Sequence, residues 1–304
     1  MKYNCMVVLD VGGTSIKSAL IGLDGRLTSV REALSNAHMG GSELMRAIEN
    51  VINQYDGYDS IAMSMSGQID VENGAIVFAT PKTIPGFTGA KVRAPLEQRF
   101  KVPVFIENDV NCAAIGEARS GAGRGYSQFL CITYGTGVGG AIVLDGQVFH
   151  GAHWSAGEIG HMLVHAGEDG AVCACGRHGC YEAYASTTAL CRMAERAVGY
   201  ALDGREIFAE LNRLHGDGPL SAVIDAWCGE ICYGLVSLIH LFNPALIVMG
   251  GGIMNEKTII ELVREKLYPM LLPSYRDVKI FGAELGNCAG MLGAWHLAKE
   301  TFQI

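Results

Sequence analysis

The sequence predicts an α/β protein built from two similar halves, and three observations support this. An order of strand, glycine turn, strand, tight turn and strand occurs twice, first from Val7 and again from Phe129. Helical and strand patterns alternate after each copy, as in α/β folds. A chain of 304 residues is long enough for two domains of roughly 150 residues each. One small module is therefore excluded.

The two copies can be followed element by element. Both contain an apolar strand, a glycine turn, a second strand, an Asp-Gly turn and a third strand. In the first copy these elements are 7–10, 12–14, 18–23, 24–25 and a strand from Arg26. In the second copy they are 129–133, the loop 135–140, 141–144, 145–146 and 147–150.

Further elements follow each copy. Leu44, Ile48, Val51 and Ile52 share one helical face, and a wholly apolar strand is expected at 245–249. The other predicted elements are strands at 61–65 and 102–106, a helix from about Val110, and helical faces over 190–198 and 223–238.

Composition excludes several classes of protein. With 49% hydrophobic and 18% charged residues the chain is expected to be globular, and a net charge of −8 without a basic run argues against nucleic-acid binding. No secretory signal is visible at the start, and the ten cysteines are irregularly spaced, which predicts a cytoplasmic protein with reduced thiols. Residues 231–255 carry no charge, but Asn243-Pro244 and three glycines favour a buried helix and strand over a membrane span.

The two glycine turns are candidate phosphate sites. Backbone N–H groups without side chains can surround phosphate oxygens, and both turns include a threonine, although either turn alone is equally typical of an ordinary hairpin. Residues 135–140 also satisfy G-x-G-x-x-G, with Glu158 about twenty residues on. That dinucleotide fingerprint requires a helix after the glycines, whereas 141–146 is predicted to be strand and turn, so we interpret it as a false match.

A cluster of thiols gives the strongest metal signal. Cys173, Cys175 and Cys180 lie within eight residues, and His161 and His165 lie upstream. Three thiolates and one imidazole would form a closed tetrahedral zinc site with a structural role. The alternative is three buried free thiols.

Three carboxylates are candidates for chemistry. Asp109 follows Asn108 between a strand and a helix, where it could cap the helix or accept a proton from an attacking hydroxyl. Glu158 and Glu182 flank the cysteine segment, either as solvated charges or as acceptors for sugar hydroxyls.

The motifs together resemble the ROK family of sugar kinases and sugar-responsive repressors, within the actin-like ATPase superfamily that includes hexokinase. The resemblance covers essentially the whole chain. It rests on the segments 9–17, 107–114, 134–140, 157–161, 173–182 and 249–252.

This resemblance implies two actin-like (ribonuclease H-like) domains with a cleft between them, built from duplicated βββαβαβα units. The expected boundaries are 1–115 plus a C-terminal helix at about 288–304, and 116–287. ATP and Mg²⁺ are expected in the cleft with a hexose beneath, and the resemblance favours a homodimer.

The resemblance also implies roles for individual residues. Asp109 would be the catalytic base, and the sugar would be held by Gly67, Asn108, Asp109, Glu158, His161 and Glu182. Structural zinc would be held by His161, Cys173, Cys175 and Cys180. ATP would be held by Asp10, Gly12, Gly13, Thr14, Lys17, Gly135, Thr136, Gly137, Gly250 and Gly251.

The expected activity is ATP-dependent phosphorylation of a hexose, with glucose to glucose 6-phosphate as the first candidate. Segment 66–70 lacks the proline and segment 81–87 the asparagine that are usual in the family's sugar-side loops. An N-acetylhexosamine such as N-acetylmannosamine, or another hexose, therefore remains open.

The alternative class is a sugar-responsive transcriptional regulator, but the first strand is expected by about Met6, without room for a preceding DNA-binding domain. A non-catalytic sugar-binding protein would be expected to lack Asp109 or intact phosphate turns.

Overall fold

The computed structural model describes residues 4–214, 216 and 218–303. Residues 1–3 and 304, which the predicted domain boundaries include, lie outside the described residues. The chain divides into two compact units. Unit 1 comprises Met1–Gly125, Gly146–Ala156 and Asn287–Ile304, and unit 2 comprises Tyr126–Asp145 and Gly157–Gly286.

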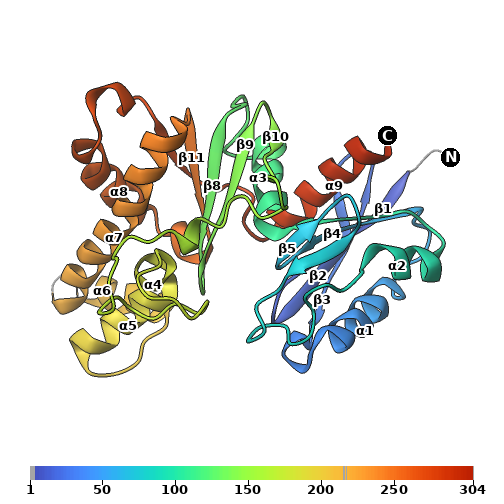
Figure 1. Cartoon of the computed structure of the whole chain (residues 1–304), viewed down its shortest axis with the longest axis horizontal. Helices are drawn as coiled ribbons and strands as arrows, with labels where there is room; N and C mark the ends of the chain where they lie inside the picture. The colour runs from blue at the N-terminus through green and yellow to red at the C-terminus, as the bar shows by residue number, and fades with distance from the viewer. Residues whose placement is uncertain (1–3, 215, 217, 304) are drawn as a thin grey trace. The chain divides into compact units, whose positions relative to one another are not determined.

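Unit 1 is built on a mixed five-stranded sheet with the order β3-β2-β1-β4-β7 (Figure 1). The strand β1 pairs with β2 antiparallel and with β4 parallel, and β4 pairs with β7 parallel. Because β1, β4 and β7 run in one direction, their carboxyl ends meet at one edge, where α/β folds bind ligands. The strands are β1 (Cys5–Val11), β2 (Ser15–Gly22), β3 (Leu27–Leu34), β4 (Ser60–Met65) and β7 (Val104–Asn108).

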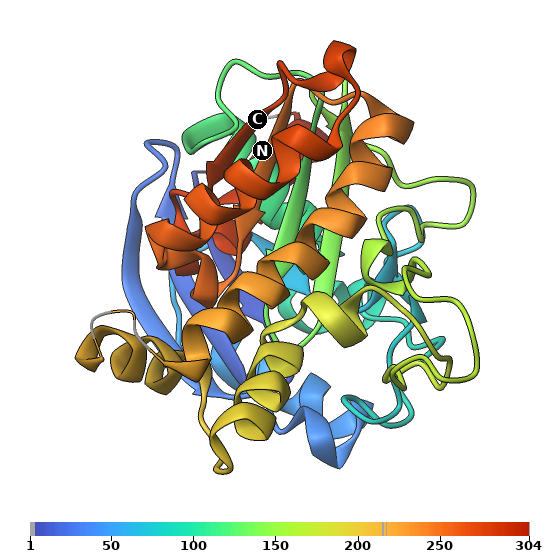
Figure 2. The same ribbon diagram turned by 90° about the vertical axis from the view of Figure 1, so that its left-hand side faces the viewer.

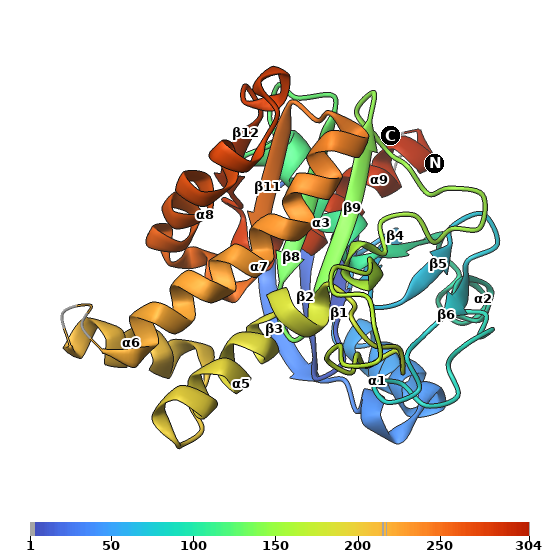
Figure 3. The ribbon, with the colours of Figure 1, turned by 60° about the vertical axis from the view of Figure 1, so that its left-hand side comes forward.

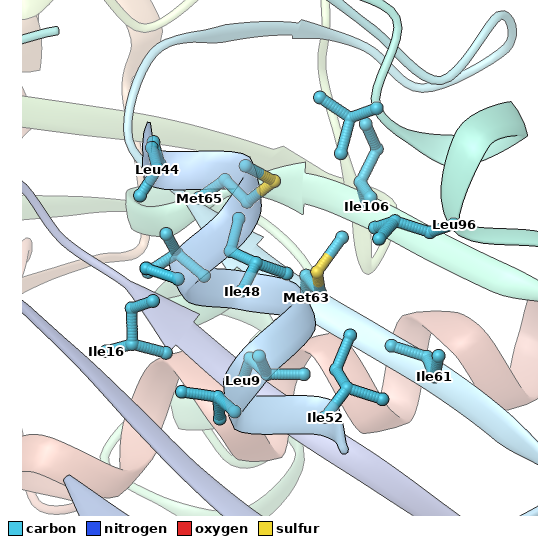
Figure 4. Close-up of a cluster of buried hydrophobic side chains, with 14 of the residues drawn as sticks. Leu9, Ile16, Leu44, Ile48, Ile52, Ile61, Met63, Met65, Leu96 and Ile106 are labelled. Carbon is cyan, nitrogen blue, oxygen red and sulfur yellow. The ribbon is translucent and has the colours of Figure 1, made fainter. Parts of the chain in front are cut away.

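The core of unit 1 lies between this sheet and α1 (Gly41–Ile52). Figure 4 shows Leu44, Ile48 and Ile52 of α1 directed at the strands that carry Leu9 and Met63, and all five side chains are buried. The spacing of these apolar residues along α1 places them on one face of the helix, as the sequence predicts. Unit 1 also contains the hairpin β5 (Gln68–Asp70) with β6 (Ala75–Phe78), and the helices η1 (Ala37–Met39) and α2 (Arg93–Phe100).

Two further helices cover the other face of this sheet. The helix α9 (Ala289–Phe302) contacts β1, β4 and β7, and packs against α3 (Asp109–Ser120). Glycines allow the two helices to approach closely: a Cβ at Gly293 would lie 1.7 Å from the Cys112 carbonyl oxygen, and one at Gly116 would lie 2.4 Å from the Ala289 carbonyl oxygen.

Unit 2 carries four strands of the second mixed sheet, in the order β9-β8-β11-β12, and Figure 3 shows α7 crossing in front of its strands. The strand β8 pairs with β9 antiparallel and with β11 parallel. These strands are β8 (Phe129–Tyr134), β9 (Val138–Leu144), β11 (Leu246–Gly250) and β12 (Lys279–Gly282). The short strand β10 (Gln147–Val148) belongs to the residues of unit 1. The helices are η2 (Ile159–His161), α4 (Glu182–Ala185), α5 (Thr187–Val198), α6 (Gly204–Arg213), α7 (Pro219–Phe242), η3 (Gly252–Asn255), α8 (Lys257–Met270) and η4 (Pro273–Tyr275), and η5 (Gly286–Cys288) precedes α9.

The helix α7 is long and apolar enough to cross a membrane by length and composition. However, 56% of its most apolar window is buried inside the protein, and it lies in front of the green strands β8 and β9 in Figure 2. Asn243 ends the helix in a left-handed conformation, and the buried strand β11 follows. The predicted buried helix and strand are therefore present in place of a membrane span.

The duplicated order of strands and turns is confirmed, with differences in the bounds of single elements. The strand predicted at 18–23 begins earlier, at Ser15. Val138, Gly139 and Gly140 belong to β9 and pair with β8, so the glycine turn is shorter than the predicted loop 135–140. The last predicted strand, 147–150, is reduced to the two residues of β10.

Candidate functional site

The first glycine turn joins β1 to β2 and forms the floor of a hollow in unit 1. A cavity of about 220 Å³ is lined by Asp10, Gly12, Gly13, Thr14, Ser15 and Lys17, which include every residue predicted for the first phosphate turn. A Cβ at Gly13 would lie 2.9 Å from Thr83 Cγ2, so a larger residue at this position would clash with the Thr83 side chain. Ser64 Oγ donates to Asp10 Oδ1 at 2.7 Å. Burial raises the pKa of Asp10, while Ser64 and Lys17 oppose the shift.

Asp109 lies at the end of β7, on the first residue of α3. Its carboxylate accepts three hydrogen bonds: Oδ2 from Ser66 Oγ at 2.9 Å, and Oδ1 from Asn108 Nδ2 at 3.0 Å and from the Val110 N–H at 2.9 Å. Burial raises the pKa of Asp109 to about 6, and the negative charge of Asp10 adds to the rise against these hydrogen bonds. The carboxyl group is therefore held in one orientation, with a pKa suited to proton transfer near neutral pH.

Asn108 connects this carboxylate to the turn at Gly67. Its Oδ1 accepts the N–H groups of Val110 and Asn111 and so caps α3, as the sequence allows. Its Nδ2 donates to the Gly67 carbonyl oxygen at 2.9 Å. Gly67 itself has φ +115, and a Cβ there would lie 2.9 Å from the Phe78 carbonyl oxygen. Asn108 thus caps α3 and also orients the Asp109 carboxylate.

The second glycine turn, between β8 and β9, is held by the start of α5. The Gly135 carbonyl oxygen accepts the Thr187 N–H at 2.9 Å, and the Thr136 carbonyl oxygen accepts Thr188 Oγ1 at 2.8 Å. A Cβ at Gly137 would lie 2.6 Å from Glu182 Oε2. The predicted phosphate turn and the predicted sugar residue Glu182 are therefore in contact within unit 2.

Gly250 is the last residue of β11, and Gly251 follows it, in a second part of unit 2. Gly251 has φ +100, and a Cβ there would lie 2.1 Å from the Tyr134 carbonyl oxygen, so glycine alone fits. The chain then continues into η3 and α8, where a cavity of about 460 Å³ is found. It is lined by Met254, Asn255, Lys257, Ile260, Glu261, Arg264, Gly282, Ala283 and Glu284, at the carboxyl ends of β11 and β12.

His161, Cys173, Cys175 and Cys180 form the predicted metal cluster, with their ligand atoms all within 4.8 Å of one another. Cys175 Sγ lies 3.7 Å from Cys180 Sγ, and Cys173 Sγ lies 3.6 Å from His161 Nδ1. Zinc–sulfur bonds of ~2.3 Å in a tetrahedron place sulfur atoms ~3.8 Å apart. Both the donor set and its spacing therefore fit Zn²⁺.

Hydrogen bonds prepare one of these thiols for ionisation. Burial of Cys175 opposes its ionisation, but hydrogen bonds from the backbone and side chain of Arg177 lower the pKa of Cys175 to about 6. Burial raises the pKa of Cys173, and its hydrogen bond to Glu182 adds to the rise. Metal binding would displace the remaining thiol protons, since thiolates are the ligands of zinc.

The metal cluster is linked to Glu158 and Glu182. His161 directs Nδ1 at Cys173, and its Nε2 lies 3.8 Å from Glu158 Oε2. Cys173 Sγ donates to Glu182 Oε1 at 2.9 Å. A metal bound through Nδ1 leaves Nε2–H of His161 as a donor beside a carboxylate. Unit 2 therefore gathers Gly137, Glu158, His161, Glu182 and the thiols in one set of contacts.

Several residues that complete these sites are absent from the sequence predictions. Ser64 and Ser66 hold Asp10 and Asp109 in unit 1, and Thr187 and Thr188 hold the second glycine turn in unit 2. The alternation of Ser64 and Ser66 at the end of a buried strand was a visible signal. His165 is not part of the metal cluster; its Nε2 lies 2.7 Å from Glu230 Oε2.

Comparison with known proteins identifies the family. The model of the ROK family matches residues 6–301. The chain belongs to the ROK family. A glucokinase of Halalkalibacterium halodurans is 33% identical over 97% of this chain and 94% of its own length. A β-glucoside kinase of Listeria innocua is 32% identical over 97% of this chain and 98% of its own length.

A solved structure of the ROK family shows the same fold. The crystal structure of a ROK-family glucokinase from Streptomyces griseus in complex with glucose and AMPPNP superposes with a TM-score of 0.85. It is 28% identical and the match covers 97% of this chain and 99% of that one. The two mixed five-stranded sheets are thus those of two actin-like ROK domains.

Proposed function

We propose that this ROK protein is an ATP-dependent sugar kinase that transfers the γ-phosphoryl group to a hexose hydroxyl, with glucose as the first candidate. The observation that carries the proposal is Asp109, an oriented carboxylate with a pKa raised to about 6 in the unit that holds the hollow of the first glycine turn. Phosphoryl transfer depends mainly on alignment and charge neutralisation, so one correctly placed base is sufficient.

In this mechanism Asp109 accepts the proton of the attacking hydroxyl. Ser66, Asn108 and the Val110 N–H fix its two oxygens, so the carboxylate does not reorient before transfer. The hydroxyl oxygen then forms a bond to the γ-phosphorus, and the bond to the leaving oxygen of ADP breaks. The reaction requires both glycine turns to act on one nucleotide during turnover, while water, a competing acceptor, is excluded.

The nucleotide would be held by the residues of the three glycine segments. Backbone N–H groups at Gly13 and Thr14, with Lys17, suit phosphate oxygens, as do those at Thr136 and Gly137. The N–H groups of Gly12 and Gly135 donate within their own turns, to the carbonyl oxygens of Ser15 and Gly137, and so shape the turns. The adenosine would lie against Gly250 and Gly251, beside the cavity of about 460 Å³. The Asp10 carboxylate is an oxygen ligand of the kind that Mg²⁺ prefers, and the bound ion would neutralise phosphate charge.

The sugar hydroxyls would be held by Gly67, Asn108, Glu158, His161 and Glu182. Glu158 and Glu182 each contact the metal cluster through one partner, so zinc would hold them in place without contacting the sugar. Zinc supplies a structural cross-link when it is bound by three thiolates and one imidazole.

A panel of sugars tests the proposal. Glucose, N-acetylmannosamine, other hexoses and β-glucosides are each offered with ATP, and ADP release is measured by a coupled assay. Turnover of at least one sugar is expected, with glucose first; the absence of ADP release with every sugar, from protein that binds zinc, would refute it. The relatives named above include both a glucokinase and a β-glucoside kinase, which is why the panel contains both classes.

We also propose that the protein is a cytoplasmic homodimer, as the resemblance to the family favours. Light scattering after size exclusion measures the assembly. A mass near twice 32.4 kDa supports the dimer, and a mass near 32.4 kDa contradicts it. Turnover of a sugar in the panel would also contradict the alternative, a regulatory protein that binds sugar without catalysis.

A further inference from the structure

Residues 146–156 belong to unit 1, although they lie in sequence between two stretches of unit 2. Two side chains attach this segment to the rest of unit 1. His150 Nε2 lies 2.6 Å from Glu107 Oε2, and Ser155 Oγ donates to Gln68 Oε1 at 2.9 Å. Glu107 directly precedes Asn108, and Gln68 directly follows Gly67. The segment is therefore attached to Glu107 and to Gln68. Their sequence neighbours Asn108 and Gly67 form the hydrogen bonds that hold the Asp109 side.

Glu107 is a buried carboxylate, 1% exposed, that no step of the mechanism uses. Its Oε1 accepts the Asn108 N–H at 2.7 Å and Asn111 Nδ2 at 3.0 Å. His150 is the partner of its other oxygen, Oε2. A buried acceptor that loses its donor costs free energy, so removal of the imidazole would favour movement of Glu107 and of the turn that it binds.

Trp154 packs against the imidazole, and its backbone is strained. The indole and the imidazole meet edge to face, with centroids 5.1 Å apart at 61°. Trp154 has φ +58, in the left-handed region that bulky side chains rarely adopt. Strained residues of this kind cluster at functional sites, so the strain at Trp154 points to a role for its side chain.

We propose that His150 and Trp154 are positioning residues for catalysis. Trp154 packs against His150, His150 donates to Glu107, Glu107 accepts the Asn108 N–H, and Asn108 Nδ2 orients the Asp109 carboxylate. This inference rests on the proposed kinase function, because it assigns the two residues to the orientation of the base. Neither residue is required to touch the substrate.

The first test removes and restores the hydrogen-bond donor. His150→Ala is expected to lower kcat about tenfold or more, since small misplacement of a base is costly, with KM for ATP changed less than about twofold. His150→Gln is expected to recover most of kcat, because its amide N–H can donate to Glu107. His153→Ala, at an exposed neighbour, is the control and should match the wild type. Equal kcat in His150→Ala and the wild type, or no recovery in His150→Gln, would overturn the inference.

The second test separates the indole from general stability. Trp154→Gly relieves the left-handed backbone, so its Tm is expected to equal or exceed that of the wild type. Its kcat is nevertheless expected to fall several-fold, and Trp154→Phe, which keeps an aromatic ring, should lose less. An unchanged kcat in Trp154→Gly, or parallel losses of kcat and Tm, would contradict the assignment.

A third measurement does not depend on turnover. The Asp109 carboxyl is titrated by ¹³C NMR, with Asp109→Asn to assign the signal. Asp109 faces Asp10, Ser66, the Asn108 amide and the Val110 N–H. In His150→Ala the loosened turn should admit water and move the midpoint downward from about 6. An unchanged midpoint overturns the inference even if the wild type phosphorylates no sugar, an outcome that would separately refute the kinase proposal.

Discussion

The two glycine turns occupy equivalent positions in their units, but their surroundings differ. The turn between β1 and β2 opens on a hollow of about 220 Å³ that carries the charged groups Asp10 and Lys17. The turn between β8 and β9 contacts Glu182 through Gly137 and is held by threonines of α5. The glycine turn thus lies near the Asp109 carboxylate in one unit and near the metal cluster in the other.

This comparison assigns different chemistry to the two copies. In unit 1, strand ends bring Asp10, Ser64, Ser66 and Asp109 to one edge of a sheet. In unit 2, a cysteine loop between β10 and α5 brings Glu182 against the turn through Cys173. Substitutions in unit 1 should therefore affect transfer, whereas those around the cysteine loop should affect sugar binding first.

The largest expected effect is that of Asp109→Asn. The amide cannot accept the proton, so kcat should fall by about 10²–10⁴-fold, with sugar affinity retained. Steady-state kinetics and calorimetry with the sugar measure both quantities. Asp56→Asn removes an exposed carboxylate of the same unit and should retain normal turnover. Turnover of Asp109→Asn at the wild-type rate would exclude Asp109 as the base.

Disruption of the metal cluster should have the next largest effect, and in a different parameter. Cys175→Ser should lose zinc, and its KM for sugar should rise by about 10–100-fold, with nucleotide affinity less affected. Metal analysis and titration with sugar and ATP provide the readouts. Cys191→Ser, at a thiol outside the cluster, is the control. One equivalent of zinc in both variants with equal sugar affinity would contradict the coordination proposed here.

A matched pair of glycines tests the contact between the second turn and Glu182. A Cβ at Gly137 would lie 2.6 Å from Glu182 Oε2, whereas one at Gly135 would meet nothing within 4 Å. Gly137→Ala should displace the carboxylate and raise KM for sugar by about tenfold, or ~1.4 kcal/mol. Gly135→Ala should change this KM little. Equal values for the two variants would show that Glu182 does not depend on the turn.

The smallest expected effect is on stability. Because the folded protein raises the pKa of Asp109 to about 6, the proton stabilises the folded state at low pH, and this contribution disappears as pH rises through 6. Asp109→Asn avoids the buried charge and should be more stable than the wild type at pH 8 by about 1–2 kcal/mol. Urea unfolding measures the free energy of unfolding of both proteins, and Asp109→Asn should be more stable than the wild type at pH 8 but not at pH 4. An equal advantage at both values would contradict the raised pKa.

Local patterns explain what could be predicted from the sequence. Alternating apolar residues and the Asp-Gly turns defined the duplicated strands, and three cysteines within eight residues defined the metal cluster together with His161. The glycine turn after β8 was predicted too long, because Val138, Gly139 and Gly140 look like loop residues yet pair with β8. Glycine content alone does not reveal which residues join a ladder.

Contacts between distant residues could not be predicted. Ser66 reaches Asp109, and His150 reaches Glu107, only because sheet register and the return of segment 146–156 to unit 1 bring them together. The raised pKa of Asp109 likewise depends on burial and on the proximity of Asp10. Ser66 and Asp109 are about 40 positions apart in the sequence, and so are Glu107 and His150. No pattern of spacing in the sequence predicts such contacts.

The pH dependence of kcat/KM for the sugar, at saturating ATP and Mg²⁺, tests the central claim most directly. This parameter reports the ionisation of the base in the enzyme–ATP complex before the sugar binds. The account predicts that activity falls tenfold per pH unit below an inflection near 6, the pKa of Asp109, and that the residual activity of Asp109→Asn lacks this inflection. A flat profile between pH 5 and pH 8, or an inflection that persists in Asp109→Asn, would contradict it.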